Sequence, residues 1–361
     1  GEAIPLYEEV LADRVRVLGP DHPDTLASRN GLAGAYYSAG RLGEAIPLFE
    51  EVLADSVRVL GDDHPDTLTS RNNLAAAYES AGRLGEAIPL YEEVLADRVR
   101  VLGDDHPDTL ASRNNLAAAY ESAGRLGEAI PLYEEVLADR VRVLGDDHPH
   151  TLASRNNLAY AYYAAGRLGE AITLYEQVLA DRVRVLGADH PDTLVSRNNL
   201  AYAYRAAGRL GEAIALFEEV LADRVRVLGA DHPDTLVSRN NLAYAYESAG
   251  RLGEAIPLYE EVLADRVRVL GDDHPHTLAS RGNLAGAYEL AGRLGEAITL
   301  FEEVLVDSVR VLGEDHPHTL ASRGSLAAAY QAVGRLGEAI PLYEQVLADS
   351  LRVLGPDHPS T

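Results

Sequence analysis

The sequence predicts an all-helical solenoid built from tandem helix-turn-helix repeats. One observation is a 42-residue period that runs without a slip through the 361 residues. A second is that each period holds two stretches with apolar residues at three- and four-residue steps, the spacing of one helix face. A third is that glycine and proline separate these stretches. The repeats begin at residues 1, 43, 85, 127, 169, 211, 253, 295 and 337, which gives eight complete repeats and part of a ninth.

The unbroken period also predicts the domain organisation. Each repeat in such an array packs mainly on its neighbours, and no change of composition interrupts the series, so we expect one domain over residues 1–361. The chain begins with Gly1, contains no methionine and stops partway through a repeat at Thr361. We therefore expect it to be a fragment of a longer chain.

Composition narrows the classes of function. The absence of cysteine excludes disulfides, thiolate zinc sites and cysteine nucleophiles. The formal net charge is −25 and all 32 basic residues are arginine, which disfavours nucleic acid as a partner. No apolar run approaches the roughly 20 residues that a membrane span needs. We expect a cytoplasmic protein with no membrane partner.

The first helix of each repeat, called helix B, carries an apolar stripe and an opposite charged face. It ends at a glycine, Gly19 in the first repeat, which suits the left-handed conformation that closes many helices. The stripe of the first repeat comprises Ala3, Ile4, Tyr7, Val10, Leu11, Val15 and Leu18.

The second helix, called helix A, begins after a proline. In the first repeat, Asp21 or His22 can accept from free backbone amides and Pro23 suits the first helical turn. Gly40 ends the helix before the next helix B. Its apolar stripe comprises Leu26, Leu32, Ala33, Tyr36 and Ala39.

Two helices in 42 residues also suit a HEAT or armadillo repeat, and the residue pattern decides between the families. The pattern resembles the tetratricopeptide repeat over the whole chain, through residues such as Leu74, Ala75, Tyr78, Gly82, Leu84, Ala87, Tyr91 and Val94. The family unit has about 34 residues, and the additional residues here lengthen helix B and its following loop. The long form is similar to kinesin light chain repeats, which share His-Pro-Asp and Asn-Asn-Leu-Ala, and to bacterial repeats attached to signalling ATPase domains. The resemblance implies a right-handed superhelix that binds proteins.

All twelve histidines lie in the loops between helix B and helix A, as His22 and the triplet His148-Pro149-His150 illustrate. They could form a row of metal sites, but a metal site needs three or four converging ligands. We expect helix-capping histidines instead. Acidic pairs such as Glu8-Glu9 recur on a solvated face, and no phosphate loop or nucleophile motif appears. We expect no catalytic residue, no metal and no cofactor.

The variation between repeats points to a binding surface. The resemblance places repeat positions 30, 34 and 37 on the concave surface, and the five tyrosines outside the two core positions all fall there. Asparagine can bind a peptide backbone and tyrosine gives contact area at small entropic cost. The predicted peptide-binding residues are Asn156, Asn198, Asn240, Tyr160, Tyr202, Tyr244, Tyr163 and Arg205. Alternatively, Tyr202 and Tyr244 reflect one duplication, because the fifth and sixth repeats are near-copies.

Three functions are compatible with these patterns. The first is a scaffold that binds a protein or peptide in its groove, for example as the sensor arm of a larger signalling protein. The second is a structural spacer or self-assembling rod, and the third, which the motifs disfavour, is a metal-dependent enzyme. Position 29, in helix A, is an arginine in every complete repeat, from Arg29 to Arg323, so we expect a groove less negative than the outer face and peptides with an apolar anchor and acidic residues. We also expect exposed apolar surfaces on the terminal helices and self-association through them.

Overall fold

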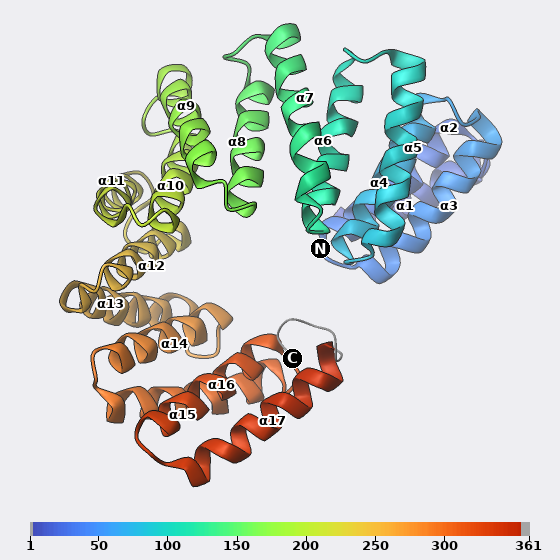
Figure 1. Ribbon diagram of the computed structural model, residues 1–361. Helices are drawn as coiled ribbons and strands as arrows, with labels where there is room; N and C mark the ends of the chain where they lie inside the picture. Colours follow the sequence, from blue (N-terminus) through green and yellow to red (C-terminus); the bar gives the residue numbers. More distant parts are fainter. Residues whose placement is uncertain (1–2, 355–361) are drawn as a thin grey trace. The chain divides into compact units, whose positions relative to one another are not determined.

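The computed structural model describes residues 3–354, and the elements in this range are 17 α-helices (Figure 1). The predicted helix-turn-helix solenoid is confirmed. The B helices are α1 (Ala3–Leu18), α3 (Leu42–Leu60), α5 (Leu84–Leu102), α7 (Leu126–Leu144), α9 (Leu168–Leu186), α11 (Leu210–Leu228), α13 (Leu252–Leu270), α15 (Leu294–Leu312) and α17 (Leu336–Leu354). The A helices are α2 (Pro23–Ser38), α4 (Pro65–Ser80), α6 (Pro107–Ser122), α8 (Pro149–Ala164), α10 (Pro191–Ala206), α12 (Pro233–Ser248), α14 (Pro275–Leu290) and α16 (Pro317–Ala332).

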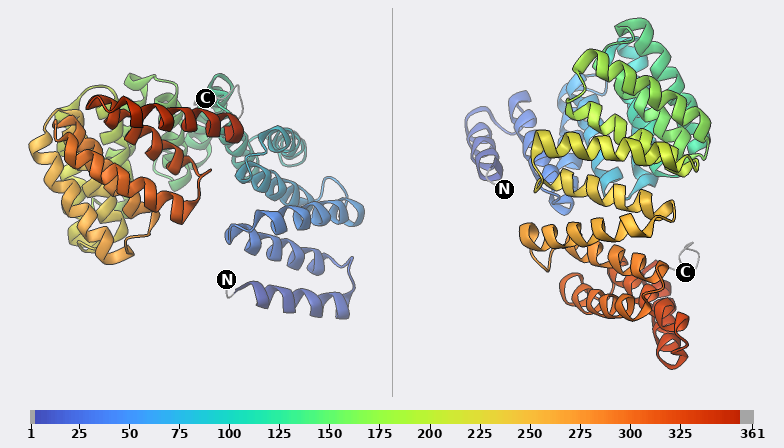
Figure 2. Two further views of the ribbon diagram at one scale, coloured as in Figure 1. Left: turned by 90° about the horizontal axis from the view of Figure 1, so that it is seen from below. Right: turned by 90° about the vertical axis from the view of Figure 1, so that its left-hand side faces the viewer.

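The chain divides into two compact units, Gly1–Asp181 and Arg182–Thr361, called the N-terminal and C-terminal units. The boundary lies inside α9. Within each unit the main contacts join helices adjacent in sequence, such as α2 with α3 and α12 with α13 (Figure 2). In the N-terminal unit α2 also contacts α4, and α4 contacts α6. The expectation of one domain over the whole chain stays a prediction.

Histidine caps begin the A helices, as predicted. In α6, the backbone N–H of Asp108 donates to Nδ1 of His106 across 3.2 Å, and Pro107 occupies the first turn. The same hydrogen bond recurs at every A helix from α2 to α16. An imidazole nitrogen that accepts from the helix N-terminus satisfies one of its free amides. The remaining capping histidine of the sequence, His358, lies outside the described residues.

Glycines in the left-handed region end both kinds of helix. After α4, Gly82 has φ +72°, its N–H donates to the carbonyl of Glu79 across 2.9 Å, and Arg83 N–H donates to the carbonyl of Tyr78 across 2.8 Å. This pair of bonds is the Schellman closure of a helix. After α5, Gly103 has φ +88°. A side chain at either position would strain the backbone.

The core lies where each B helix inserts between two A helices. In the N-terminal unit, Ile88 and Tyr91 of α5 pack with Ala75 of α4 and with Leu116 and Ala119 of α6. The fully buried alanines let the helices approach closely, as the sequence predicts, and tyrosine fills the space between them. None of the described helices is both long and apolar enough to cross a membrane.

A cluster of polar groups that recurs in each repeat joins helix A to the helices around it. The hydroxyl of Tyr78 donates to Glu50 across 2.6 Å, while the guanidinium of Arg83 lies 4.3 Å from the centre of the Tyr78 ring and pairs with Glu86. Burial and the Glu50 carboxylate raise the pKa of Tyr78 to about 12. The arginine–tyrosine stack recurs in all eight turns between helix A and helix B.

A second guanidinium is buried between helix B and helix A of the same repeat. In the fourth repeat, Arg140 of α7 donates to the backbone carbonyl of His150 across 3.2 Å and to Oγ of Ser154 across 2.6 Å. Burial lowers the pKa of Arg140, which shows that the charged form is partly desolvated. The two hydrogen bonds offset that penalty.

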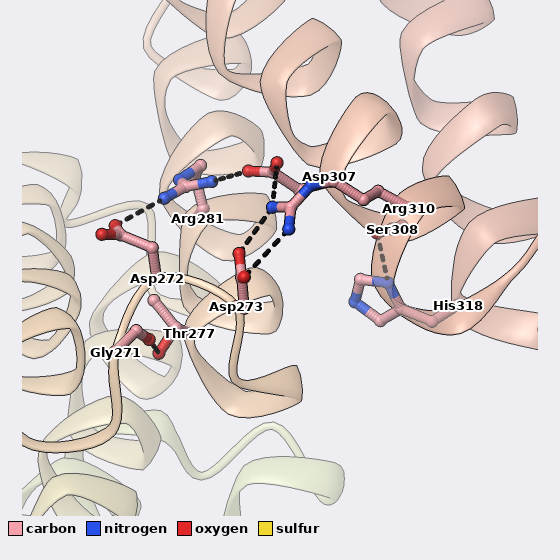
Figure 3. A network of polar contacts seen from close by, with 9 residues as sticks. All are labelled: Gly271, Asp272, Asp273, Thr277, Arg281, Asp307, Ser308, Arg310 and His318. Carbon is pink, nitrogen blue, oxygen red and sulfur yellow. Dashed lines mark hydrogen bonds and ion pairs between the residues drawn. The ribbon is translucent and has the colours of Figure 1, made fainter.

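Serine replaces this arginine in some repeats, and the space is then used differently. Beside Ser56, a cavity of about 90 Å³ is lined in part by Asp66 and Ser70, which are the residues that a guanidinium would reach. Beside Ser308, the ring of His318 occupies the space, with its Nδ1 3.2 Å from the serine hydroxyl (Figure 3). Burial lowers the pKa of His318.

Candidate functional site

The candidate site lies on the side of helix A that faces away from the core, called the A-helix face and defined by repeat positions 30, 34 and 37. Residues three and four apart share one side of a helix. In α8 these positions are Asn156, Tyr160 and Tyr163, whereas Leu158 and Tyr162 point into the core and are buried. The local helix geometry therefore brings the predicted residue types onto one surface.

In the N-terminal unit, the predicted residues Asn156, Tyr160 and Tyr163 all lie on α8. The Tyr160 side chain is 49% exposed, and its ring stacks on that of Tyr163 with centroids 6.3 Å apart and planes 27° from parallel. Aromatic rings in an offset stack stabilise one another beyond their burial. The pair presents a broad aromatic surface to solvent.

In the C-terminal unit, α10 carries Asn198, Tyr202 and Arg205, while α12 carries Asn240 and Tyr244. The structure brings three of these side chains together. The guanidinium carbon of Arg205 lies 4.4 Å from the centre of the Tyr244 ring and 5.8 Å from that of Tyr202. Tyr244 is 43% exposed and Tyr202 is half-buried.

Tyr202 is fixed from beneath by the core. Its ring meets the buried Phe217 edge-on, with centroids 5.3 Å apart and planes at 81°. An edge-to-face contact is a favourable arrangement of two aromatic rings. Arg205 thus lies near Tyr202, which itself packs on the buried Phe217. The role of the eight predicted residues in binding a peptide stays a prediction.

The asparagines on this face have a structural partner that sequence reasoning missed. The side-chain amide of Asn241 donates to the carbonyl oxygen of Asn198 across 3.2 Å, and that of Asn283 donates to Asn240 across 3.0 Å. The same bond joins successive repeats in the N-terminal unit, from Asn73 to Asn30, Asn115 to Asn72 and Asn157 to Asn114. A bound peptide backbone would therefore meet the amide donors of Asn198 and Asn240 rather than their oxygens.

A signal for these asparagine bonds was present in the sequence. The two partners are 43 residues apart, so position 31 of one repeat pairs with position 30 of the repeat before it. Where position 30 becomes glycine, at Gly282, the following position 31 becomes serine, at Ser325. The paired loss of asparagine across a repeat boundary indicates contact.

The arginines at position 29 of helix A pair with carboxylates of the next helix B. Arg71 is buried, and its guanidinium pairs with Asp97 of the next helix B across 2.7 Å. Asp97 also pairs with Arg100 across 2.7 Å, and Arg100 reaches back to Asp63 across 2.8 Å. These arginines do not supply free charge to the face, because each is held in an ion-pair network between repeats. That the groove is less negative than the outer face stays a prediction.

Figure 3 shows this network in the C-terminal unit. Arg281 lies between Asp307, at 2.7 Å, and Asp272, at 3.4 Å, while Arg310 contacts Asp307 at 2.7 Å and Asp273 at 2.9 Å. The hydrogen bond from Arg310 lowers the pKa of Asp273. The network fastens each helix B to the loop and the helix A of the preceding repeat.

Position 37 of the A-helix face carries acids in several repeats. Glu121 is half-buried, and burial raises its pKa although the hydroxyl of Tyr133 donates to it. Glu247 behaves alike, with its pKa raised by burial against a hydrogen bond from Tyr259. These carboxylates bind a core tyrosine of the next helix B, and within the described residues no cluster of three or more metal-ligating side chains occurs.

Apolar residues are exposed on both terminal helices, as predicted. On α1, Leu6, Tyr7 and Val10 line a groove of about 450 Å³ between α1 and α2. On α17, Ile340 and Leu347 are about half exposed. Self-association through these surfaces stays a prediction.

Comparison with known proteins identifies the repeat. A family model of the tetratricopeptide repeat matches residues 1–56, 30–98, 81–140, 198–266, 240–306 and 291–352, and a second tetratricopeptide model matches residues 151–192. Comparison with curated proteins found no match.

Solved structures share the fold. Nearly identical TPR-like repeats of a kinesin light chain-like protein from Podosopora anserina are 40% identical, with 57% of this chain and 98% of that chain covered and a TM-score of 0.54. The apo quorum sensor NprR from B. thuringiensis is 15% identical over 96% of this chain and 92% of that chain, with a TM-score of 0.62. A signal transduction ATPase with a tetratricopeptide repeat sensor, from Pyrococcus horikoshii, is 15% identical over 96% of this chain and 53% of that chain, with a TM-score of 0.60. At such identity the last two show a shared fold alone.

Proposed function

Because this chain belongs to the tetratricopeptide repeat family, we propose that it binds a partner protein through an extended peptide segment on its A-helix face and catalyses no reaction. Tetratricopeptide solenoids are typical of interaction scaffolds and sensors. Each repeat exposes one side of helix A, so successive repeats within one unit offer a series of neighbouring contact positions. A ligand on this surface would touch several repeats at once.

The observation that carries the proposal is the exposure of large aromatic side chains on helix A. Tyr160 and Tyr244 are almost half exposed, whereas the core aromatics Tyr175 and Phe217 are buried. Exposed aromatic side chains beside polar groups are typical of binding surfaces, because they bury a large area at the cost of few rotatable bonds. The amide donors of Asn198 and Asn240 lie on the same two helices as the C-terminal tyrosines and can bind peptide carbonyls.

A sensing role is supported by the fold shared with a quorum sensor and with a signalling ATPase that has a tetratricopeptide repeat sensor. In such an arrangement the solenoid recognises the signal and a neighbouring domain responds to it. The proposal for this chain is limited to the first step, which is the capture of a peptide by the A-helix face.

The test is to pan a random peptide display library on the whole chain and measure the affinities of the enriched peptides. The double variant Tyr202→Ala/Tyr244→Ala, with both changes in the C-terminal unit, should lose roughly tenfold or more in affinity, as truncation of aromatic contact residues commonly does. Tyr7→Ala is the matched control, because Tyr7 is exposed to the same degree, at 42%, but lies on helix B. Circular dichroism checks that the variants stay helical. Equal affinity of the double variant, the control and the unchanged chain would refute the proposal.

A further inference from the structure

Arg205 occupies an unusual setting near the end of α10. Its guanidinium lies over the ring of Tyr244 and near that of Tyr202, and Tyr202 rests on Phe217. An arginine over an aromatic face is attracted by the ring, by roughly 0.5–1 kcal/mol at exposed sites and more when desolvated. Stacking uses the flat faces of the guanidinium, so its N–H groups point along the edge and stay available to an acceptor.

In residues 3–354, Arg205 alone among the arginines has no hydrogen bond or ion pair. Its Nε is buried and has no hydrogen-bond partner. Among the other arginines, Arg184 also has an interaction partner, and each of the rest binds a carboxylate, a hydroxyl or a backbone carbonyl. A buried N–H without an acceptor is unfavourable, so the protein itself leaves the guanidinium of Arg205 incompletely satisfied.

The charge of the surroundings makes this cation distinctive. Among the first eight repeats, position 37 is Arg only in the fifth and is Glu, Gln or Tyr in the remaining seven. Arg205 is therefore the one cation at this position. The acid at the same position of the next repeat, Glu247, accepts a hydrogen bond from Tyr259 instead. In a chain with a net charge of −25, all other arginines are engaged by the protein, and the free charge lies on the A-helix face.

We propose that Arg205, held by Tyr202 and Tyr244, is the receptor for a carboxylate of the bound peptide. A guanidinium presents parallel N–H donors that match the two oxygens of a carboxylate, and its two terminal nitrogens form such a pair. The carboxylate belongs to an Asp or Glu side chain or to the C-terminus of the ligand. This inference rests on the proposed peptide-binding function and adds the chemical group that the surface selects.

The experiment uses an array of random-sequence peptides, each synthesised in three forms. The first has one Glu and an amidated C-terminus, the second has Gln in its place and a free C-terminal carboxylate, and the third has Gln and an amidated C-terminus. The whole chain should bind one of the carboxylate forms roughly tenfold or more tightly than the uncharged third form, as expected for a charge-assisted hydrogen bond. A preference for the first form identifies a side-chain carboxylate, and a preference for the second identifies the C-terminus.

The variant Arg205→Gln should remove this preference while the uncharged peptides still bind. Glutamine is suited to the position, because Gln331 occupies it in the eighth repeat. Arg16→Gln, an exposed change on α1, should leave the preference intact. Binding without a carboxylate preference, or a preference that survives in Arg205→Gln, would overturn the inference and leave the proposed function standing. Failure of every peptide form to bind the whole chain would overturn both.

Discussion

Reciprocal exchange of arginine and serine at position 14 of the repeat should move local stability in opposite directions. Arg140→Ser removes a guanidinium that donates to the carbonyl of His150 and to Oγ of Ser154, and Ser56→Arg introduces one into the cavity of about 90 Å³ that Asp66 and Ser70 line in part. Two hydrogen bonds from a charged donor contribute about 1.5–3 kcal/mol each. About 2 kcal/mol of side-chain entropy and the desolvation seen in the lowered pKa of Arg140 oppose them. We expect a net loss of about 1–2 kcal/mol for Arg140→Ser and a gain of about 1 kcal/mol for Ser56→Arg.

Native-state hydrogen exchange is the suitable assay, because a repeat array need not unfold in one step. Exchange should accelerate about 5- to 30-fold in α7 and α8 of Arg140→Ser, and should slow about 5-fold in α3 and α4 of Ser56→Arg. Arg142→Ser is the matched control, since its guanidinium lies on the same helix but is exposed, where solvent and salt screen its ion pairs and leave them a small effect on stability. Faster exchange in Ser56→Arg, or an equal effect of the two arginine variants, would refute the reasoning.

Three further substitutions test other parts of the fold. Burial raises the pKa of Glu121, so its ionised form is unfavourable in the folded state, and the stability present at low pH is lost as the pH rises through the raised pKa. Glu121→Gln should therefore stabilise the protein at pH 7 and have no such effect below about pH 4. Chemical denaturation at both pH values measures this difference. Asp97→Ala removes the ion-pair partner that Arg71 and Arg100 share and should lower the free energy of unfolding by about 2–3 kcal/mol in chemical denaturation. A loss no larger than that caused by removing the exposed Asp63 would contradict the role of this network in joining the repeats. His106→Ala removes an N-cap acceptor and should cost about 1 kcal/mol, read from exchange of the first-turn amides of α6; unchanged exchange there would show that the cap contributes nothing.

The inter-repeat contacts explain how the chain keeps its A-helix face available. Ion pairs such as Arg71 with Asp97 and hydrogen bonds such as Asn115 with Asn72 bind one repeat to the next. They hold successive A helices at a fixed spacing, so a ligand meets a surface that is already ordered. A preformed surface lowers the entropy lost on binding.

Part of the candidate site followed from the sequence. The helix period places positions 30, 34 and 37 on one side of helix A, and the structure confirms that placement for residues such as Tyr160 and Tyr244. The same reasoning assigned the helix A arginines to the groove and left the asparagines without an internal partner. Both errors concern contacts between residues 26 or 43 positions apart, which no local pattern reports.

The sequence by itself determined the fold, the helix ends and the family of this protein, because helix periodicity, histidine caps and closing glycines are local properties that recur in every repeat. Only the tertiary structure decided which arginines form ion pairs or hydrogen bonds within the protein and which do not. Arg71 and Arg205 are both arginines of helix A, yet one is buried against Asp97 and the other stacks on Tyr244 without an acceptor. The difference arises from the neighbouring repeat, whose side chains come within hydrogen-bonding distance only when the helices pack.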